Sequence, residues 1–156
     1  IQNDKPIIGT YNVNSEGSSD MYYKGANMLH TLRQLINDDQ KWRQLLRGLN
    51  KTFYHQTVTT QEIENYISEF SGLKLTAFFN QYLRDIRIPN FEYYLENNEL
   101  SYRWNNVVDG FEMPIEIEIN DKNQWLYPTA VWQKTEINSS KINIDRNYYI
   151  DHKQLK

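Results

Sequence analysis

Residues 82–96 have the sequence YLRDIRIPNFEYYLE, and the proline at position 89 divides the chain. Before it, apolar residues recur at every third or fourth position, as they do on one face of a helix. After it they alternate with polar residues, as they do on a strand. Proline cannot continue a helix and disfavours helix in the residue before it. We therefore place a domain boundary between Ile88 and Pro89, with one domain in residues 1–88 and another in residues 89–156.

Two helices are predicted in the first half of the N-terminal domain. The first begins near Asp20, where Ser18, Ser19 or Asp20 can cap the free amide groups. The segment Asn37-Asp38-Asp39 is expected to end this helix and to begin the second, so the two helices run antiparallel. We expect the apolar stripes of both helices to face the core. Their members are Tyr22, Gly25, Met28, Leu29, Leu32, Leu35, Ile36, Trp42, Leu45, Leu46, Leu49 and Phe53.

A third and a fourth helix complete the predicted helical domain. Thr59 and Glu62 have the spacing of a capping box at the start of the third helix, and Gly72 is suited to end it. Apolar residues at helical spacing predict the fourth helix over about residues 75–84. Residues 1–19 are rich in Gly and Ser without periodicity, which indicates a loop.

The C-terminal domain has the pattern of short antiparallel strands. Residues 91–96 and 99–104 flank Asn97-Asn98, which suits a two-residue hairpin turn because asparagine tolerates positive φ. Residues 111–120 alternate strictly between apolar and polar, and Pro114 within them favours an edge or a bulge. Further strands are expected near residues 125–127, 130–137, 141–144 and 148–150. The predicted fold class is therefore α+β, with a four-helix segment followed by a small antiparallel β-sandwich.

The composition excludes several classes of partner. The 156 residues are 39% hydrophobic and carry a net charge of −3, which supports a folded core and gives no basis for charge-driven binding to nucleic acid. No apolar run approaches the roughly 20 residues that span a bilayer, so we expect no membrane insertion. The chain begins with Ile1 rather than Met, so we expect a processed chain or a piece of a longer protein.

The residues offer no complete active site. There is no cysteine, and none of the three histidines, His30, His55 and His152, is spaced to share a metal with another on one helical face. Glu116 and Glu118 project from the same face of one predicted strand, where an alternating acidic pattern is typical of a solvated side. Serine-nucleophile and phosphate-loop motifs are absent. We expect this chain by itself to bind no metal and no other cofactor.

Residues 21–33, MYYKGANMLHTLR, resemble the Y-x-K-G-A-x-x-L-x-x-L stretch of the M1 family of zinc aminopeptidases. Further segments are similar to that family in the same order, so the resemblance covers about residues 20–90 and the strands after it resemble the β-sandwich that follows the catalytic domain. These segments are Asp38-Asp39, the Trp42/Leu45/Leu46 helix, Val58-Thr59-Thr60, Ser71-Gly72-Leu73-Lys74-Leu75, Phe78-Phe79-Asn80-Gln81-Tyr82-Leu83 and Ile88-Pro89.

The resemblance implies a catalytic role for Tyr22. In the family, the tyrosine three residues before the glycine donates a hydrogen bond to the oxyanion that forms when water attacks the peptide carbonyl. Tyr23 is the adjacent alternative. The competing explanation for Tyr22 is an aromatic residue packed into the core at the start of a helix. Lys24 and Gly25 are expected to serve helix packing rather than chemistry.

The family's zinc motif, H-E-x-x-H with a later glutamate, precedes this region and does not occur in the chain. The resemblance therefore implies a fragment: residues 1–88 as the C-terminal part of an M1-type catalytic domain, and residues 89–156 as the following β-sandwich. Zinc and the general base would belong to the missing N-terminal half of the parent enzyme, which removes N-terminal residues from peptide substrates. This chain alone is expected to be inactive.

Two alternatives remain open. The protein is a non-catalytic M1-like pseudoenzyme if the zinc motif has been lost, and the coding sequence upstream of Ile1 would separate this case from an enzyme. It is an independent interaction module if the β-sandwich and its aromatic residues act alone. The lack of cysteine and the abundance of Asn and Tyr lead us to expect a periplasmic or cell-envelope parent protein.

Overall fold

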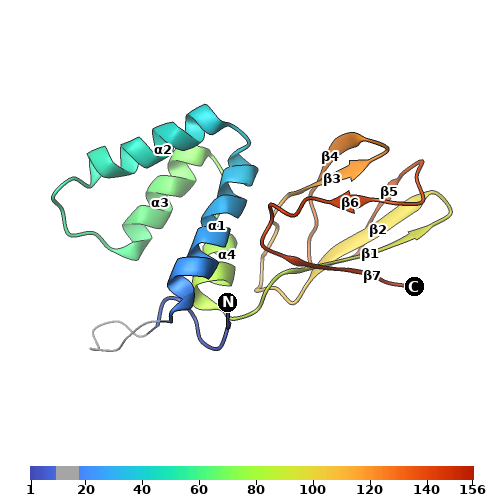
Figure 1. Ribbon diagram of the computed structural model, residues 1–156, viewed down its shortest axis with the longest axis horizontal. Coiled ribbons are helices and arrows are strands. Elements are labelled where there is room, and N and C mark those ends of the chain that lie inside the picture. Colours follow the sequence, from blue (N-terminus) through green and yellow to red (C-terminus); the bar gives the residue numbers. More distant parts are fainter. Residues whose placement is uncertain (10–17) are drawn as a thin grey trace.

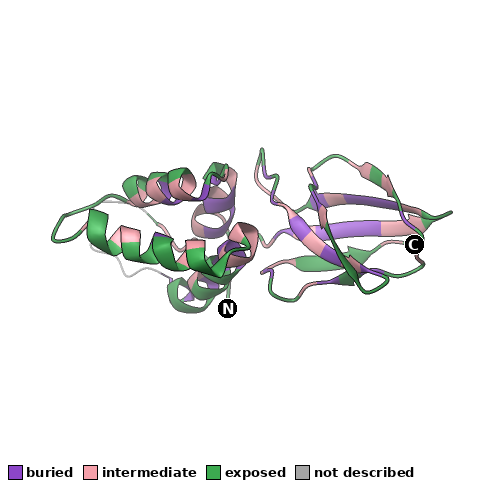
Figure 2. Cartoon of the chain, turned by 90° about the horizontal axis from the view of Figure 1, so that it is seen from above, coloured by how far each residue is buried: buried purple, intermediate pink, exposed green. Residues whose placement is uncertain are grey.

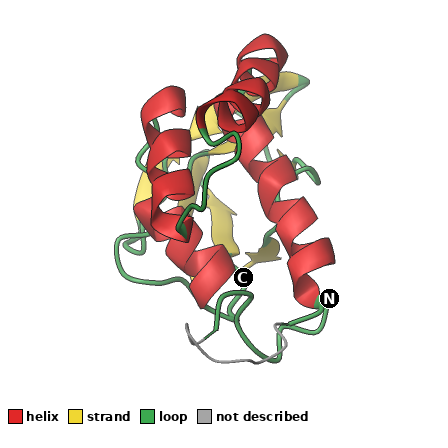
Figure 3. Ribbon diagram, turned by 90° about the vertical axis from the view of Figure 1, so that its left-hand side faces the viewer, coloured by secondary structure: helices red, strands yellow, loops and turns green. Residues whose placement is uncertain are grey.

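A computed structural model describes residues 1–9 and 18–156. The loop expected over residues 1–19 therefore lies partly outside the described residues. Helices occupy the N-terminal part of the chain and two small sheets the C-terminal part, which confirms the predicted α+β class (Figure 1). Seen from the helical end, the strands lie behind the helices (Figure 3).

The first two helices are α1 (Asp20–Ile36) and α2 (Asp39–Thr52). At the start of α1, Ser18 accepts a hydrogen bond from the Asp20 amide through its side chain, over 3.2 Å. Asn37 ends α1 in the left-handed region at φ 49°, and Asp38 caps α2 by accepting the Gln40 and Lys41 amides. The short connection predicted at residues 37–39 is therefore confirmed.

The other helical elements are α3 (Thr60–Ser71), α4 (Thr76–Phe79) and a π-helical turn, η1 (Asn80–Arg84). The capping box of Thr59 and Glu62 is present, and Gly72 ends α3 with φ 75°. The predicted fourth helix is thus split into one α-helical turn and one wider turn. Widening the turn changes the direction in which Gln81 and Tyr82 project, and both side chains are buried.

Within residues 1–9 and 18–156, seven strands form two sheets around a shared apolar core. The larger sheet has the order β5-β2-β1-β7 and the smaller one the order β4-β3-β6. In chain order the strands are β1 (Asn90–Glu96), β2 (Glu99–Asn105), β3 (Ile115–Ile119), β4 (Lys122–Leu126), β5 (Gln133–Glu136), β6 (Asn143–Ile144) and β7 (Asp151–Gln154).

The β1–β2 hairpin matches its prediction. Asn97 and Asn98 have φ values of 50° and 63°, the positive values that this tight turn requires. The last strand differs from its prediction: it lies at Asp151–Gln154 rather than at residues 148–150, and it pairs with β1 in parallel. The larger sheet is therefore not wholly antiparallel, because the chain returns to β1 from the helical side.

The alternating segment 111–120 also differs from its prediction. Only Ile115–Ile119 forms a strand, and β3 is the central strand of its sheet rather than an edge. Pro114 directly precedes the strand, where its missing N–H removes no bond from the ladder. Phe111 and Met113 are buried without being in a strand, because they turn back toward Trp104 and the helices.

Burial is uneven between the two parts of the molecule (Figure 2). Burial alternates along β3, as predicted, whereas β1 and β2 each bury three consecutive residues, 91–93 and 100–102. In α2 only Leu45 is buried, and Leu46, which was expected in the core, is exposed. The predicted stripe of α2 is therefore only partly covered by the residues that the structure describes.

Candidate functional site

The first turn of α1 carries the candidate catalytic residue on its outer surface. Tyr22 is 70% exposed and Tyr23 is 71% exposed. Leu29, two turns further along the Tyr22 face, is exposed as well. The prediction that Tyr22 and Leu29 lie on the buried stripe is therefore wrong, and so is the explanation of Tyr22 as a core aromatic.

The buried side of the same turn is polar. Asp20 is 2% exposed and Lys24 is fully buried. The Asp20 carboxylate accepts the Gln2 amide at 2.9 Å and the Asn3 amide at 2.6 Å. These two bonds hold the pKa of Asp20 below its usual value of 3.8, against the opposing effect of burial. Charged and polar contacts therefore orient the first turn of α1, whereas Met28 and Leu32 of the apolar stripe are buried further along the helix.

Gly25 is half-buried and lies within about 60° of Tyr22 around the axis of α1. Apart from its two chain neighbours and the surrounding backbone of α1, a Cβ atom added there would meet no atom of the described residues within 4 Å. The prediction that Gly25 serves packing therefore finds no support in the described residues. Glycine within a helix costs about 1 kcal/mol relative to alanine, so its presence here has no local structural benefit.

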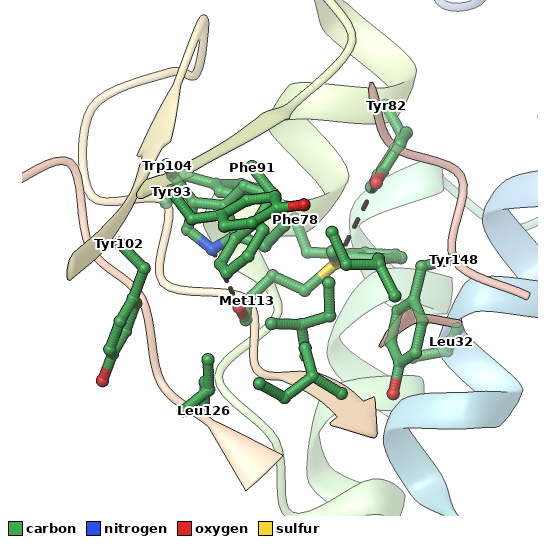
Figure 4. Packing of buried hydrophobic residues seen from close by; sticks show 14 of the residues in the cluster. Leu32, Phe78, Tyr82, Phe91, Tyr93, Tyr102, Trp104, Met113, Leu126 and Tyr148 are labelled. Atoms are coloured by element: carbon green, nitrogen blue, oxygen red, sulfur yellow. Dashed lines mark hydrogen bonds between the residues drawn. The ribbon is translucent and has the colours of Figure 1, made fainter. Parts of the chain in front are cut away.

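Two buried residues of η1 join the helices to the strands. Tyr82 donates a hydrogen bond to the Tyr149 backbone oxygen at 2.8 Å and makes a longer contact of 3.9 Å with the Met113 sulfur (Figure 4). Gln81 accepts the Val108 amide at 2.7 Å and donates to the backbone oxygen of Arg87 at 2.8 Å. The parts on either side of Pro89 are thus held together by buried hydrogen bonds.

A second set of contacts links α1 to the loop between β6 and β7. The Tyr149 amide donates to the Thr31 hydroxyl at 2.8 Å, and His30 bonds Asn147 at 2.9 Å. A cleft of about 600 Å³ also has walls from both parts, with Phe78 and Met113 among its lining residues. This cleft exists only when the helices and the sandwich are docked.

The structure does not bring the histidines together with other metal ligands. In the described ranges, no three side chains of His, Asp or Glu lie close enough to share a metal ion. His30 is on α1, His55 follows α2 and His152 is in β7. Glu116 and Glu118 are both half-buried on β3 and line a small cleft with Asp145. The zinc implied by the family resemblance therefore does not fit any set of described residues.

Lys24 was expected to serve helix packing, and it is buried, whereas the burial of Asp20 and Gln81 was missed by sequence reasoning. Asp20, Lys24 and Gln81 interrupt or flank apolar stripes, and a hydropathy pattern assigns such residues to the surface. The one available signal was the position of Lys24 within the quoted motif, two residues after Tyr22.

No family model matches the chain, and no curated protein matches it. The resemblance to the M1 family therefore rests on the motif residues of the sequence alone. None of the helices in the described part of the chain is long and apolar enough to cross a membrane.

Proposed function

We propose that this chain is the C-terminal part of an M1-type zinc aminopeptidase, and that it supplies Tyr22 as the hydrogen-bond donor to the transition state. The parent enzyme removes N-terminal residues from peptides. Its zinc and general base come from the N-terminal half of the catalytic domain. The observation that carries the proposal is the exposure of Tyr22 on a helix whose opposite face is firmly anchored.

A phenol suits this role because its O–H is a neutral donor that stays protonated at neutral pH. A donor that strengthens only as negative charge develops on the carbonyl oxygen lowers the barrier without tightening substrate binding. Zinc, when bound by the other half, would activate water and polarise the carbonyl. Tyr22 would then face that centre from α1.

The surface around Tyr22 has features expected of an interface with another part of the parent protein. Tyr22, Ala26 and Leu29 lie along one exposed side of α1, and the open space at Gly25 is beside them. A glycine with free space above it permits another backbone to approach closely. We assign this surface to the interface with the zinc-binding half of the enzyme.

The alternative of an independent β-sandwich module has one observation in its favour. Tyr127 and Val131 are exposed on the loop between β4 and β5. However, an independent module would not need buried hydrogen bonds from Gln81 and Tyr82 to hold it against the helices. We therefore favour the enzyme fragment, and the pseudoenzyme alternative differs from it only in the upstream zinc motif.

The test replaces Tyr22 by Phe in the protein that also carries the zinc-binding half. Removing one oxyanion donor should lower kcat by about 10²- to 10³-fold, while KM changes little. Steady-state kinetics on an aminoacyl substrate measures both parameters.

Tyr23→Phe is the matched control. Its ring is as exposed as that of Tyr22, but it projects about 100° away around the helix. Equal losses of kcat in the two variants, or an unchanged kcat in Tyr22→Phe, would exclude the proposed role.

A further inference from the structure

Lys24 is a fully buried lysine on a helix that has ample access to solvent on its other side. A lysine normally keeps its ammonium group in water while its carbon chain covers apolar surface. Burying the charge is unfavourable unless it is paired and hydrogen-bonded. The position of Lys24 therefore requires specific partners.

Those partners lie at the boundary between the two parts of the molecule. The Lys24 ammonium donates a hydrogen bond to the backbone oxygen of Asp85 at 2.9 Å. The carboxylates of Asp20 and Asp85 both act favourably on its charge, although burial itself lowers the pKa of Lys24. Lys24 thus joins the start of α1 to the segment that leads into β1.

The contacts continue from Asp85 into the β-sandwich. Arg87 pairs with the Asp85 carboxylate at 2.8 Å and donates to the Val107 backbone oxygen at 2.9 Å. The Gln81 side chain, on η1, donates a hydrogen bond to the Arg87 backbone oxygen. The first turn of α1 is therefore connected through Asp85 and Arg87 to the loop after β2.

We propose that Lys24 is a positioning residue, which fixes the first turn of α1 and with it the Tyr22 hydroxyl. This inference rests on the proposed function. Lys24 lies two residues after Tyr22 and projects about 200° away around the helix, so it anchors the face opposite the one that presents the phenol. The beginning of the same turn is held by the Gln2 and Asn3 amides, which donate hydrogen bonds to the Asp20 carboxylate.

Positioning matters because a displacement of about 1 Å at a catalytic group can lower the rate by about 10²-fold. Lys24→Met keeps the length and volume of the side chain but removes the charge and the donor. We expect this substitution to lower kcat by about 10- to 100-fold in the protein that carries both halves, with KM nearly unchanged. Lys24→Arg, which retains a buried donor, should recover part of the loss.

The decisive experiment is a double-mutant cycle with Tyr22→Phe. If Lys24 acts through Tyr22, Lys24→Met should lower kcat in the wild-type background and have little further effect in the Tyr22→Phe background. Met28→Ala is the matched control, because Met28 is also buried on α1 but lies outside these polar contacts. It should lower the free energy of unfolding without a specific loss of kcat.

Each outcome has a separate meaning. An unchanged kcat in Tyr22→Phe contradicts the proposed function itself. If Tyr22→Phe does lower kcat, two results would contradict the role of Lys24 while leaving the proposed function standing. One is that the effects of Lys24→Met and Tyr22→Phe on kcat are additive. The other is that Lys24→Met and Met28→Ala lower kcat equally. If Lys24→Met does not fold, Arg87→Met at its exposed site takes its place in the cycle. Its expected result is a kcat loss of about 3- to 10-fold that disappears without the Tyr22 hydroxyl, and an additive result overturns the inference.

Discussion

The strands and the helices of this chain bury their apolar residues to different extents. In the β-sandwich, Tyr127 and Val131 are the exposed large apolar residues among those the structure describes. The helical part exposes Ile1, Met21, Tyr22, Tyr23, Leu29, Leu46, Tyr54, Val58 and Ile86. The strands thus leave little large apolar surface exposed, whereas the helices leave more, as we expect if another part of the parent protein covers them.

The largest difference in stability should appear between Trp104 and Leu46. Trp104 is 1% exposed, packs against Phe91 and Phe111, and donates its indole N–H to the Met113 oxygen. Trp104→Ala should lower the free energy of unfolding by about 3–5 kcal/mol. Leu46→Ala, on the open side of α2, should change it by less than about 0.5 kcal/mol. Urea unfolding of both variants measures the difference, and similar losses would show that the helical surface is covered in solution.

A smaller effect is expected at the contact between the two parts. Tyr82→Phe removes the donor to the buried Tyr149 oxygen and should cost about 1–2 kcal/mol. Tyr54→Phe, whose ring is exposed, is the control and should have no measurable effect. Because the two parts share these bonds, the circular dichroism of helices and the fluorescence of tryptophans should report one unfolding transition. Two separated transitions would mean that the parts are independent.

Two helical glycines should respond in opposite directions. Gly25→Ala meets open space and should stabilise this chain by up to about 1 kcal/mol through helix propensity. Gly48→Ala should destabilise it, because the new methyl group would overlap the Tyr66 hydroxyl on α3. In the protein with both halves, Gly25→Ala should instead lower activity. Thermal unfolding and kinetics together test this reversal, and a Gly25→Ala variant that gains stability and keeps full activity would argue against a close partner at α1.

The smallest effect concerns pH. Asp20 has a folded-state pKa below its usual value of 3.8 because the Gln2 and Asn3 amides donate to its carboxylate. Its contribution to stability is therefore fully present above about pH 4 and is lost as pH falls through the lower, folded-state pKa. Asp20→Asn should flatten this part of the curve of unfolding free energy against pH. Parallel curves for the two proteins would show that these bonds do not persist in solution.

Sequence patterns predicted the elements that depend on local chemistry. The capping box at Thr59, the helix end at Gly72 and the Asn97-Asn98 turn all follow from bonds within a few residues. The patterns failed where contacts between residues far apart in the sequence determine which side chains are buried. Tyr22 and Leu29 occupy apolar positions but are exposed, because Lys24 and Thr31 bind partners far away in the sequence and turn α1 toward them.

The candidate site also combines a residue that the sequence identified with contacts that only the fold reveals. Tyr22 was found through a motif, and its exposure could not be predicted from the hydropathy of its own helix. The roles of Lys24 and Gln81 depend on backbone atoms of Asp85, Arg87 and Val108, which no side-chain pattern records. Polar residues that bond a distant backbone have no periodic signature.

The parallel pairing of β7 with β1 also affects the order in which the strands of the larger sheet pair during folding. The β1–β2 hairpin joins neighbouring residues and can form within microseconds. Pairing residue 90 with residue 151 must instead close a long loop, whose entropy is lost before the contact is gained. On the ribosome, the free side of β1 therefore stays available to wrong partners until the final strand has emerged. We therefore expect slow completion of this edge to leave the nascent chain open to non-native strand pairing during synthesis.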